Sequence, residues 1–187
     1  TRRGESVEVW TLCAGYPPRG EALTDFAAGK HAEWRVDERT VVRVRREEDR
    51  QACLRLGAGL RWWSLPDCIY RRLPNGDPLI TYNDALWLPL HPGEQGLVLR
   101  LRAWLRRTLR EDDRLVCPLT LGNHVDHRLA RSAVEGLRRP IYFYADYPYV
   151  ARDSLHLPLG LPADQICRQP VSEQGLLAWQ ESVAAYA

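Results

Sequence analysis

The chain has 187 residues, which is enough for one domain with a full hydrophobic core but short for two. Its 26 Lys and Arg residues and 24 Asp and Glu residues leave a net charge of +2, so the composition carries no footprint of a protein that binds nucleic acid or an anionic membrane. The 45% hydrophobic and 27% charged residues are typical of a soluble globular protein, and no apolar run approaches the length of a membrane span.

The cysteines indicate buried, reduced thiols rather than a disulfide framework or a cysteine metal site. Their number is odd, they are scattered, and no two have C-x-x-C spacing. This usage is typical of a cytoplasmic protein, and we therefore expect a cytoplasmic location. The five residues are Cys13, Cys53, Cys68, Cys117 and Cys167.

The first third of the chain predicts strands and helices in alternation. Short β-branched or aromatic runs predict strands, and apolar residues at helical intervals predict helices. In chain order these are a strand at Ser6–Leu12, a short helix within Leu23–Val36, a helix at Val41–Leu56 and a strand at Leu60–Leu65. Residues 68–93 follow as a long irregular segment, and loops of this length are often functional.

The same alternation continues to the end of the chain. Gln95–Arg110 has the clearest amphipathic pattern, and Ser172 is a candidate N-cap for the last helix. In chain order the elements are a helix at Gln95–Arg110, a strand at Arg114–Leu119, a helix at Asp126–Leu137, a strand at Pro140–Ala145 and a helix at Val171–Ala187. Residues 147–170 are rich in proline and predict a loop.

This order predicts a three-layer, Rossmann-like α/β fold with a mostly parallel sheet, formed by residues 1–187 as a single domain. The first residues, Thr1 to Gly4, look like the last turn of a helix and its glycine stop. The chain contains no Met. We therefore expect a domain that is truncated at its N-terminus and slightly at its C-terminus, with an unpaired edge beside the first strand.

The segment His124-Val125-Asp126-His127 is the most informative motif. It lies between a predicted strand and a predicted helix, where open α/β sheets bind ligands. A neutral imidazole is a common zinc ligand, and a nearby carboxylate can fix the tautomer of a histidine. The alternative interpretation is a polar turn in which Asp126 caps the helix and both histidines are solvated.

Four segments in this order resemble the LmbE-like, or PIG-L, family of zinc-dependent N-acetyl-sugar deacetylases. Residues 2–15 (RRGESVEVWTLCAG) are similar to the second strand of the family and its turn. The spacing from Arg45 through Glu48 to Gly57 is similar to its second helix, and Asp67 occupies an acidic position after the next strand. Residues 124–127, the fourth segment, match its His-x-Asp-His motif. In addition, residues 179–187 are similar to its closing helix.

The resemblance implies a zinc site and a role for each polar residue of the motif. His127 would be a zinc ligand, and His124 would face the oxyanion or the leaving amine as an acid or electrostatic stabiliser. Asp126 would hold a histidine in the correct tautomer. The other ligands and the general base belong to a His-x-Asp-Asp motif of the family, which this sequence lacks and which we expect upstream of Thr1.

The same resemblance implies that Arg45 binds a polar group of the substrate, because its fork of donors suits a hydroxyl pair or a carboxylate. The alternative is a solvated position among neighbouring arginines. We interpret Glu48 as a structural partner of those arginines, and Asp67 as a residue that caps a turn or supports the site.

The aromatic residues near the fourth predicted strand divide into two pairs. Tyr142 and Tyr144 share one face of the strand, and we expect both in the core. Tyr147 and Tyr149 lie beyond the strand, where they could stack on a sugar or pack in the core; the sequence leaves both open.

The first functional hypothesis is a zinc-dependent hydrolase that removes an N-acetyl group from a small amino-sugar conjugate, with a homo-oligomer left open. The alternative is a non-catalytic carbohydrate- or nucleotide-binding module that has lost the zinc site. A Rossmann-like methyltransferase or nucleotide enzyme is disfavoured, because no Gly-x-Gly-x-x-Gly segment follows any predicted strand.

Overall fold

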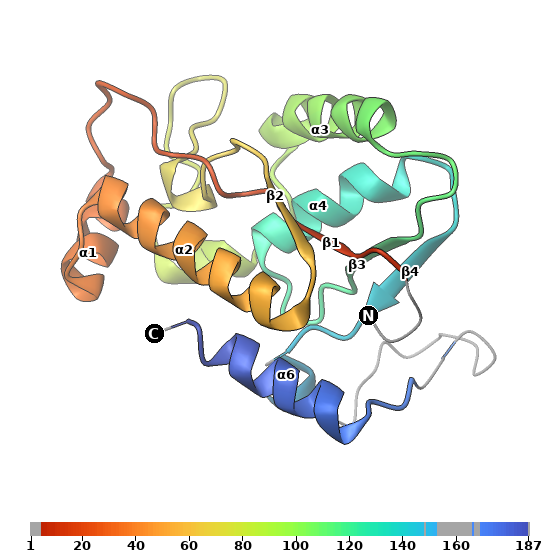
Figure 1. Ribbon diagram of the computed structural model, residues 1–187. Helices are drawn as coiled ribbons and strands as arrows, with labels where there is room; N and C mark the ends of the chain where they lie inside the picture. The colour runs from red at the N-terminus through yellow and green to blue at the C-terminus, as the bar shows by residue number, and fades with distance from the viewer. Residues whose placement is uncertain (1–4, 148, 153–165, 167–168, 187) are drawn as a thin grey trace. The chain divides into compact units, whose positions relative to one another are not determined.

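A computed structural model describes residues 5–147, 149–152, 166 and 169–186 (Figure 1). The chain divides into two compact units. The first consists of Thr1–Arg71 and Cys167–Ala187, and the second of Arg72–Ile166. That the whole chain forms one domain stays a prediction.

The first unit is built on two parallel strands, β1 (Glu8–Thr11) and β2 (Gly59–Trp62). Helix α2 (Glu38–Leu56) connects them in the chain and packs against β2 and against α6 (Glu173–Val183). A shorter helix, α1 (Asp25–Trp34), precedes α2. The strand–helix–strand order with parallel pairing is the arrangement that the sequence predicts.

The ends of α2 follow from local chemistry. The carboxylate of Asp37 accepts hydrogen bonds from the backbone N–H groups of Arg39 and Thr40, and so caps the first turn. Gly57 ends the helix with φ 64°, a left-handed conformation that favours glycine. The predicted cap of the last helix is also confirmed, because Ser172 accepts the N–H of Gly175.

The second unit repeats the pattern. Strand β3 (Leu115–Pro118) pairs in parallel with β4 (Ile141–Tyr144), and α4 (Val125–Glu135) connects them. Helix α3 (Gln95–Thr108) packs against α4. Three apolar residues of α3 are buried, in keeping with its amphipathic pattern. They are Val98, Leu101 and Leu105.

Short helices occupy segments that the sequence describes as irregular. Single 3₁₀ turns lie at Cys68–Tyr70, Asn83–Trp87 and Pro92–Glu94. A helix that the sequence did not predict, α5 (Tyr149–Arg152), follows β4 inside the predicted loop. Most of the rest of that loop lies outside the described residues. No helix in the described part of the chain is both long and apolar enough to cross a membrane.

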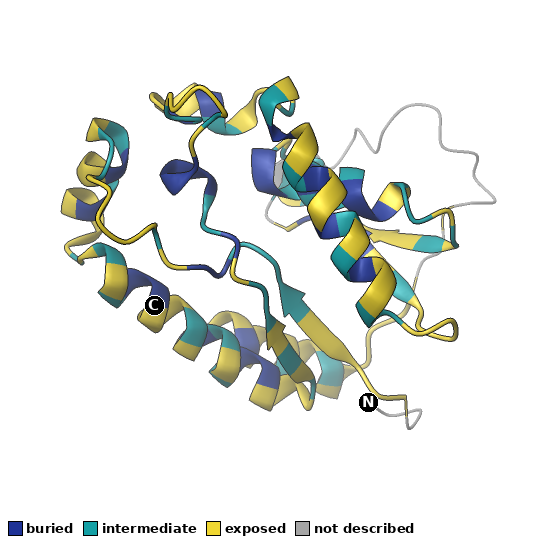
Figure 2. Cartoon of the chain, turned by 90° about the horizontal axis from the view of Figure 1, so that it is seen from above, coloured by how far each residue is buried: buried dark blue, intermediate teal, exposed yellow. Residues whose placement is uncertain are grey.

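The mixed α/β class and the parallel pairing are confirmed, and all four predicted strands occur. Within the described residues the pairs are β1–β2 in the first unit and β3–β4 in the second, each parallel. The strands themselves are largely exposed or half-buried, as the yellow and teal colours in Figure 2 show.

The expectation that Tyr142 and Tyr144 lie in the core is wrong. Their exposed fractions are 56% and 49%, and Val116, which is paired with Tyr142, is 56% exposed. On the other face of β3, Cys117 is only 3% exposed. The two tyrosines do share a face, but it is the face of the β3–β4 pair that remains open to solvent.

One carboxylate joins three elements of the first unit to the last residues of the chain. Asp49, on α2, accepts hydrogen bonds from the Thr11 hydroxyl (2.8 Å) and the Trp62 indole N–H (3.1 Å). It also accepts one from the Tyr186 hydroxyl (2.7 Å), just beyond α6. These bonds connect α2 with β1, β2 and the end of the chain.

We predict that Asp49→Ala destabilises the protein by about 1–3 kcal/mol, because three donors lose a common half-buried acceptor. Urea unfolding measures the change. The matched control on the same helix is Glu47→Ala, which removes a solvent-exposed ion pair with Arg50 and is expected to cost less stability than Asp49→Ala. Equal losses in the two variants would contradict a central role for Asp49.

Candidate active site

The residues of the His-x-Asp-His motif lie in the second unit, where β3 leads into α4. Leu119 extends the β3–β4 pairing by donating its N–H to the Tyr144 carbonyl, 2.9 Å away. The chain then turns through Thr120 (φ 66°) and Asn123 (φ 58°). Both residues adopt the left-handed region, which is uncommon for side chains other than glycine and frequent at functional sites.

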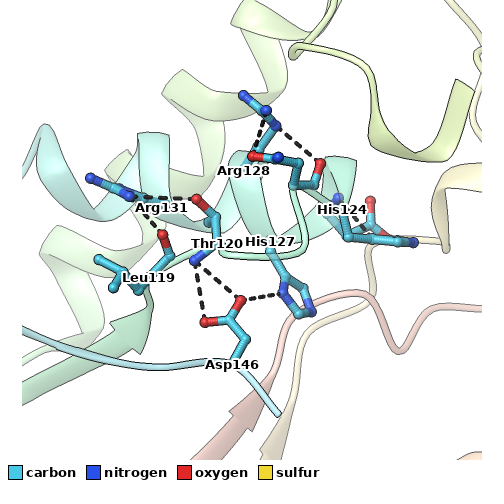
Figure 3. Close-up of polar contacts among 9 residues, drawn as sticks. Leu119, Thr120, His124, His127, Arg128, Arg131 and Asp146 are labelled. Atoms are coloured by element: carbon cyan, nitrogen blue, oxygen red, sulfur yellow. Dashed lines mark hydrogen bonds and ion pairs between the residues drawn. The ribbon is translucent and has the colours of Figure 1, made fainter. Parts of the chain in front are cut away.

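Asp146 fixes this turn from the neighbouring strand. It lies two residues beyond the end of β4, and its side chain is 1% exposed. The backbone N–H of Thr120 donates to both carboxylate oxygens, at 3.2 and 3.1 Å (Figure 3). The Arg131 guanidinium adds a hydrogen bond to the Leu119 carbonyl at 2.8 Å.

The same carboxylate reaches a histidine of the motif. His127 Nδ1 lies 3.0 Å from Asp146 Oδ2, and the His127 side chain is 36% exposed (Figure 3). The imidazole therefore has one nitrogen on a buried carboxylate, while the ring as a whole keeps access to solvent.

His124 is the N-cap of α4. Its Nδ1 accepts the backbone N–H of Asp126, 3.3 Å away, so the histidine takes the capping role that one interpretation gave to Asp126. Asp126 itself lies in the first turn of α4 and is buried, with an exposed fraction of 9%. An acidic residue there is favourable because the helix N-terminus carries partial positive charge.

Each of the two histidines has an aromatic ring as a neighbour. Centroid distances are 6.4 Å from Trp87 to His124, 5.6 Å from His124 to His127, and 6.3 Å from His127 to Tyr149. Gly122 provides the space for the Tyr149 ring, because a Cβ at that position would lie 2.3 Å from it. The outer rings give the pair of imidazoles two apolar neighbours.

The structure thus brings together four residues singled out from the sequence: His124, Asp126, His127 and Tyr149. Tyr147 is 61% exposed, and its role in substrate binding stays a prediction.

The remaining candidates lie in the first unit. Arg45, on α2, contacts Glu48 Oε2 through Nη1 at 2.8 Å, which confirms Glu48 as a structural partner of an arginine. The Arg45 side chain is 54% exposed, and its contact with a substrate stays a prediction. Asp67 caps the 3₁₀ turn at Cys68–Tyr70 by accepting the Ile69 N–H, as expected for a capping role.

Sequence reasoning missed Asp146 and Trp87. Asp146 had a usable signal, because it follows a strand predicted to be parallel to the strand before the motif, and the carboxyl ends of parallel neighbours share one edge. Trp87 had none, because it lies in an irregular segment with no pattern that connects it to the motif.

No family model matches the sequence, and no curated protein gives a significant match. Solved structures do match over 99% of this chain. The zinc-inhibited form of teicoplanin deacetylase Orf2 has 22% identity, a TM-score of 0.76 and 74% of its own chain covered.

Two further structures give the same result. A deacetylase–teicoplanin complex has 24% identity, a TM-score of 0.76 and 77% of its chain covered. The A40926 pseudoaglycone deacetylase Dbv21 has 22% identity, a TM-score of 0.65 and 71% of its chain covered. At this level of identity, the matches show that the chain shares the fold of these proteins.

Cys117, on β3 next to the site, is expected to be unreactive. Burial raises the pKa of its thiol from 9.0 to about 12, so the thiol stays protonated at neutral pH and supplies neither a nucleophile nor a thiolate ligand. Because this pKa is higher in the folded state, the contribution of Cys117 to stability is present below pH 9.0 and is lost as the pH rises toward 12.

We predict that iodoacetamide at about pH 8 leaves Cys117 unmodified in the folded protein and modifies it after denaturation. Peptide mass spectrometry measures both states. Partly exposed Cys13 is the internal comparison and should react faster in the folded protein. Rapid modification of folded Cys117 would show that this face of β3 opens to solvent.

Proposed function

We propose that this protein is a metal-dependent hydrolase that removes an N-acetyl group from an amino-sugar conjugate. The observation that carries the proposal is the pair of histidines at the start of α4, one of which has its Nδ1 on the buried Asp146 carboxylate. The fold shared with the teicoplanin and A40926 deacetylases supports the same reaction class. A fold alone does not fix a function, so the argument depends on the site.

His127 fits the role of a zinc ligand. Metal-binding histidines commonly place their other ring nitrogen on a carboxylate, as His127 does with Asp146. One imidazole does not close a zinc site, which takes three protein ligands in a catalytic centre, and the His-x-Asp-Asp motif that would complete the set is not in the printed sequence. When bound, zinc would polarise the amide carbonyl and lower the pKa of water to about 7.

We propose that His124 acts on the amide that is cleaved. Its ring lies beside that of His127, with a centroid separation of 5.6 Å, so a carbonyl group held at His127 would be within reach of His124. We assign His124 to stabilise the developing oxyanion or to protonate the leaving amine. Asp126 is proposed to hold His124 in the correct tautomer from the first turn of α4, through the backbone N–H that His124 Nδ1 accepts.

Aromatic side chains are proposed to hold the sugar. Trp87 and Tyr149 flank the histidine pair, and aromatic faces offer an apolar surface to a sugar ring while its hydroxyls stay with polar partners. Tyr147 and Arg45 are proposed as further contacts with the conjugate, Arg45 with a hydroxyl pair or a carboxylate. A cytoplasmic location and self-association stay predictions.

We predict that two alanine variants differ in zinc content, in the protein as its gene encodes it. His127→Ala removes a ligand, so zinc content and amine release from N-acetylglucosamine conjugates should fall together. His124→Ala should keep zinc but lower turnover by roughly 10²–10⁴-fold, the range for a lost acid–base group. Elemental analysis and an amine assay measure the two quantities.

The contrast separates chemistry from destabilisation, which would affect both variants alike. Full zinc and full activity in His127→Ala would exclude the assigned ligand. A parent protein that binds the conjugate but neither binds zinc nor releases amine would favour the carbohydrate-binding module.

A further inference from the structure

The two histidines of the site use the same ring nitrogen, Nδ1, in opposite ways. In His127, Nδ1 faces a carboxylate oxygen; in His124, Nδ1 faces a backbone N–H. A neutral imidazole has one N–H and one bare nitrogen, and its partners decide which is which.

For His127 the partner is an acceptor. An ionised carboxylate can only accept, and both Asp146 oxygens already accept the Thr120 N–H at 3.2 and 3.1 Å. Nδ1 of His127 must therefore carry the proton and donate it to Asp146. The lone pair of the ring is then on Nε2.

For His124 the partner is a donor. A backbone N–H, here that of Asp126, cannot accept, so Nδ1 of His124 must be bare to cap the helix. The proton of the neutral ring is then on Nε2, which makes Nε2 a donor.

We propose that Asp146 is a positioning residue that, together with the N-cap of α4, sets the two histidines in opposite tautomers. His127 presents a lone pair on Nε2, which can bind a metal, while His124 presents an N–H on Nε2, which can donate to an oxyanion. The assignment of these uses rests on the proposed function, whereas the tautomers themselves rest on the hydrogen bonds alone.

The geometry around Asp146 explains why this residue rather than water does the positioning. Its side chain is 1% exposed, so it has no solvent to turn toward, and the left-handed backbone of Thr120 aims a fixed N–H at it. The carboxylate therefore has one orientation, and it transmits that orientation to the His127 ring. Buried partners of this kind commonly change metal affinity by 10–100-fold when they are replaced.

Long-range ¹H–¹⁵N NMR of the metal-free, ¹⁵N-labelled protein tests the proposal, at about pH 8.5, where an ordinary histidine with a pKa near 6.5 is neutral. His127→Gln and His124→Gln assign the two rings by loss of their signals. The expected result is protonated Nδ1 in His127 and protonated Nε2 in His124. A wild-type His127 protonated on Nε2 overturns the proposal whether or not Asp146→Asn folds.

Asp146→Asn then tests the cause. An asparagine has a single oxygen, which the Thr120 N–H retains, so its NH₂ group faces His127 and favours a bare Nδ1. The tautomer of His127 should invert while that of His124 stays. Asp49→Asn, which disturbs a carboxylate network in the first unit, is the matched control and should change neither ring. An unchanged His127 in a folded Asp146→Asn protein refutes the positioning role.

Titration with Zn²⁺ alone and the amine assay distinguish this proposal from the function on which it rests. Asp146→Asn should weaken zinc binding by about 10–100-fold. Correct tautomers in a protein without zinc binding or amine release would leave the positioning role and remove the hydrolase. Amine release by a wild-type protein whose His127 is protonated on Nε2 would support the hydrolase and refute the positioning role.

Discussion

The buried carboxylate of Asp146 is the constraint on which the site depends. A carboxylate with 1% exposure needs hydrogen-bond donors, because an uncompensated charge away from water costs several kcal/mol. Two donors come from the segment that follows β3: the N–H of Thr120 and the ring of His127. The hydrogen bonds that the Asp146 carboxylate requires therefore fix both the turn after β3 and the first turn of α4, which carries His127.

The N-cap of α4 departs from the residue types that helices usually prefer at this position. Helices favour Ser, Thr, Asp or Asn at the N-cap, and α2 and α6 follow that rule with Asp37 and Ser172. In α4 the cap is His124, whose Nδ1 accepts at a longer 3.3 Å. This longer cap bond, three residues before His127 and close to the left-handed Thr120, is the kind of local inconsistency that accompanies functional sites.

The sequence predicted the elements well because their signals are local. Leu101 and Leu105 recur at helical spacing, and the run Ile141–Tyr144 is β-branched and aromatic, so α3 and β4 lie where expected. Which face of a strand is covered depends on the arrangement of other elements. That is why Tyr142 and Tyr144, correctly placed on one face, were wrongly placed in the core.

The residues of the site also divide into those with a local sequence signal and those without one. The motif at residues 124–127 is contiguous and could be found, whereas Asp146 is nineteen positions from His127 and Trp87 lies in an irregular segment. Their contacts with the histidines arise from β3–β4 pairing and from the path of a loop, neither of which has a local pattern. The tautomers also required atomic positions, because the spacing His-x-Asp-His does not indicate which carboxylate contacts which ring.

Those tautomers also bear on the choice between a hydrolase and a binding module. A module that only holds a sugar gains from aromatic faces such as Trp87 and Tyr149, and it has no need for two adjacent imidazoles of opposite polarity. Amide hydrolysis needs both at once, a lone pair to hold an electrophile and a donor to stabilise the charge that develops. The shared fold admits either function, so the arrangement of protons around His124 and His127 is the feature that favours catalysis.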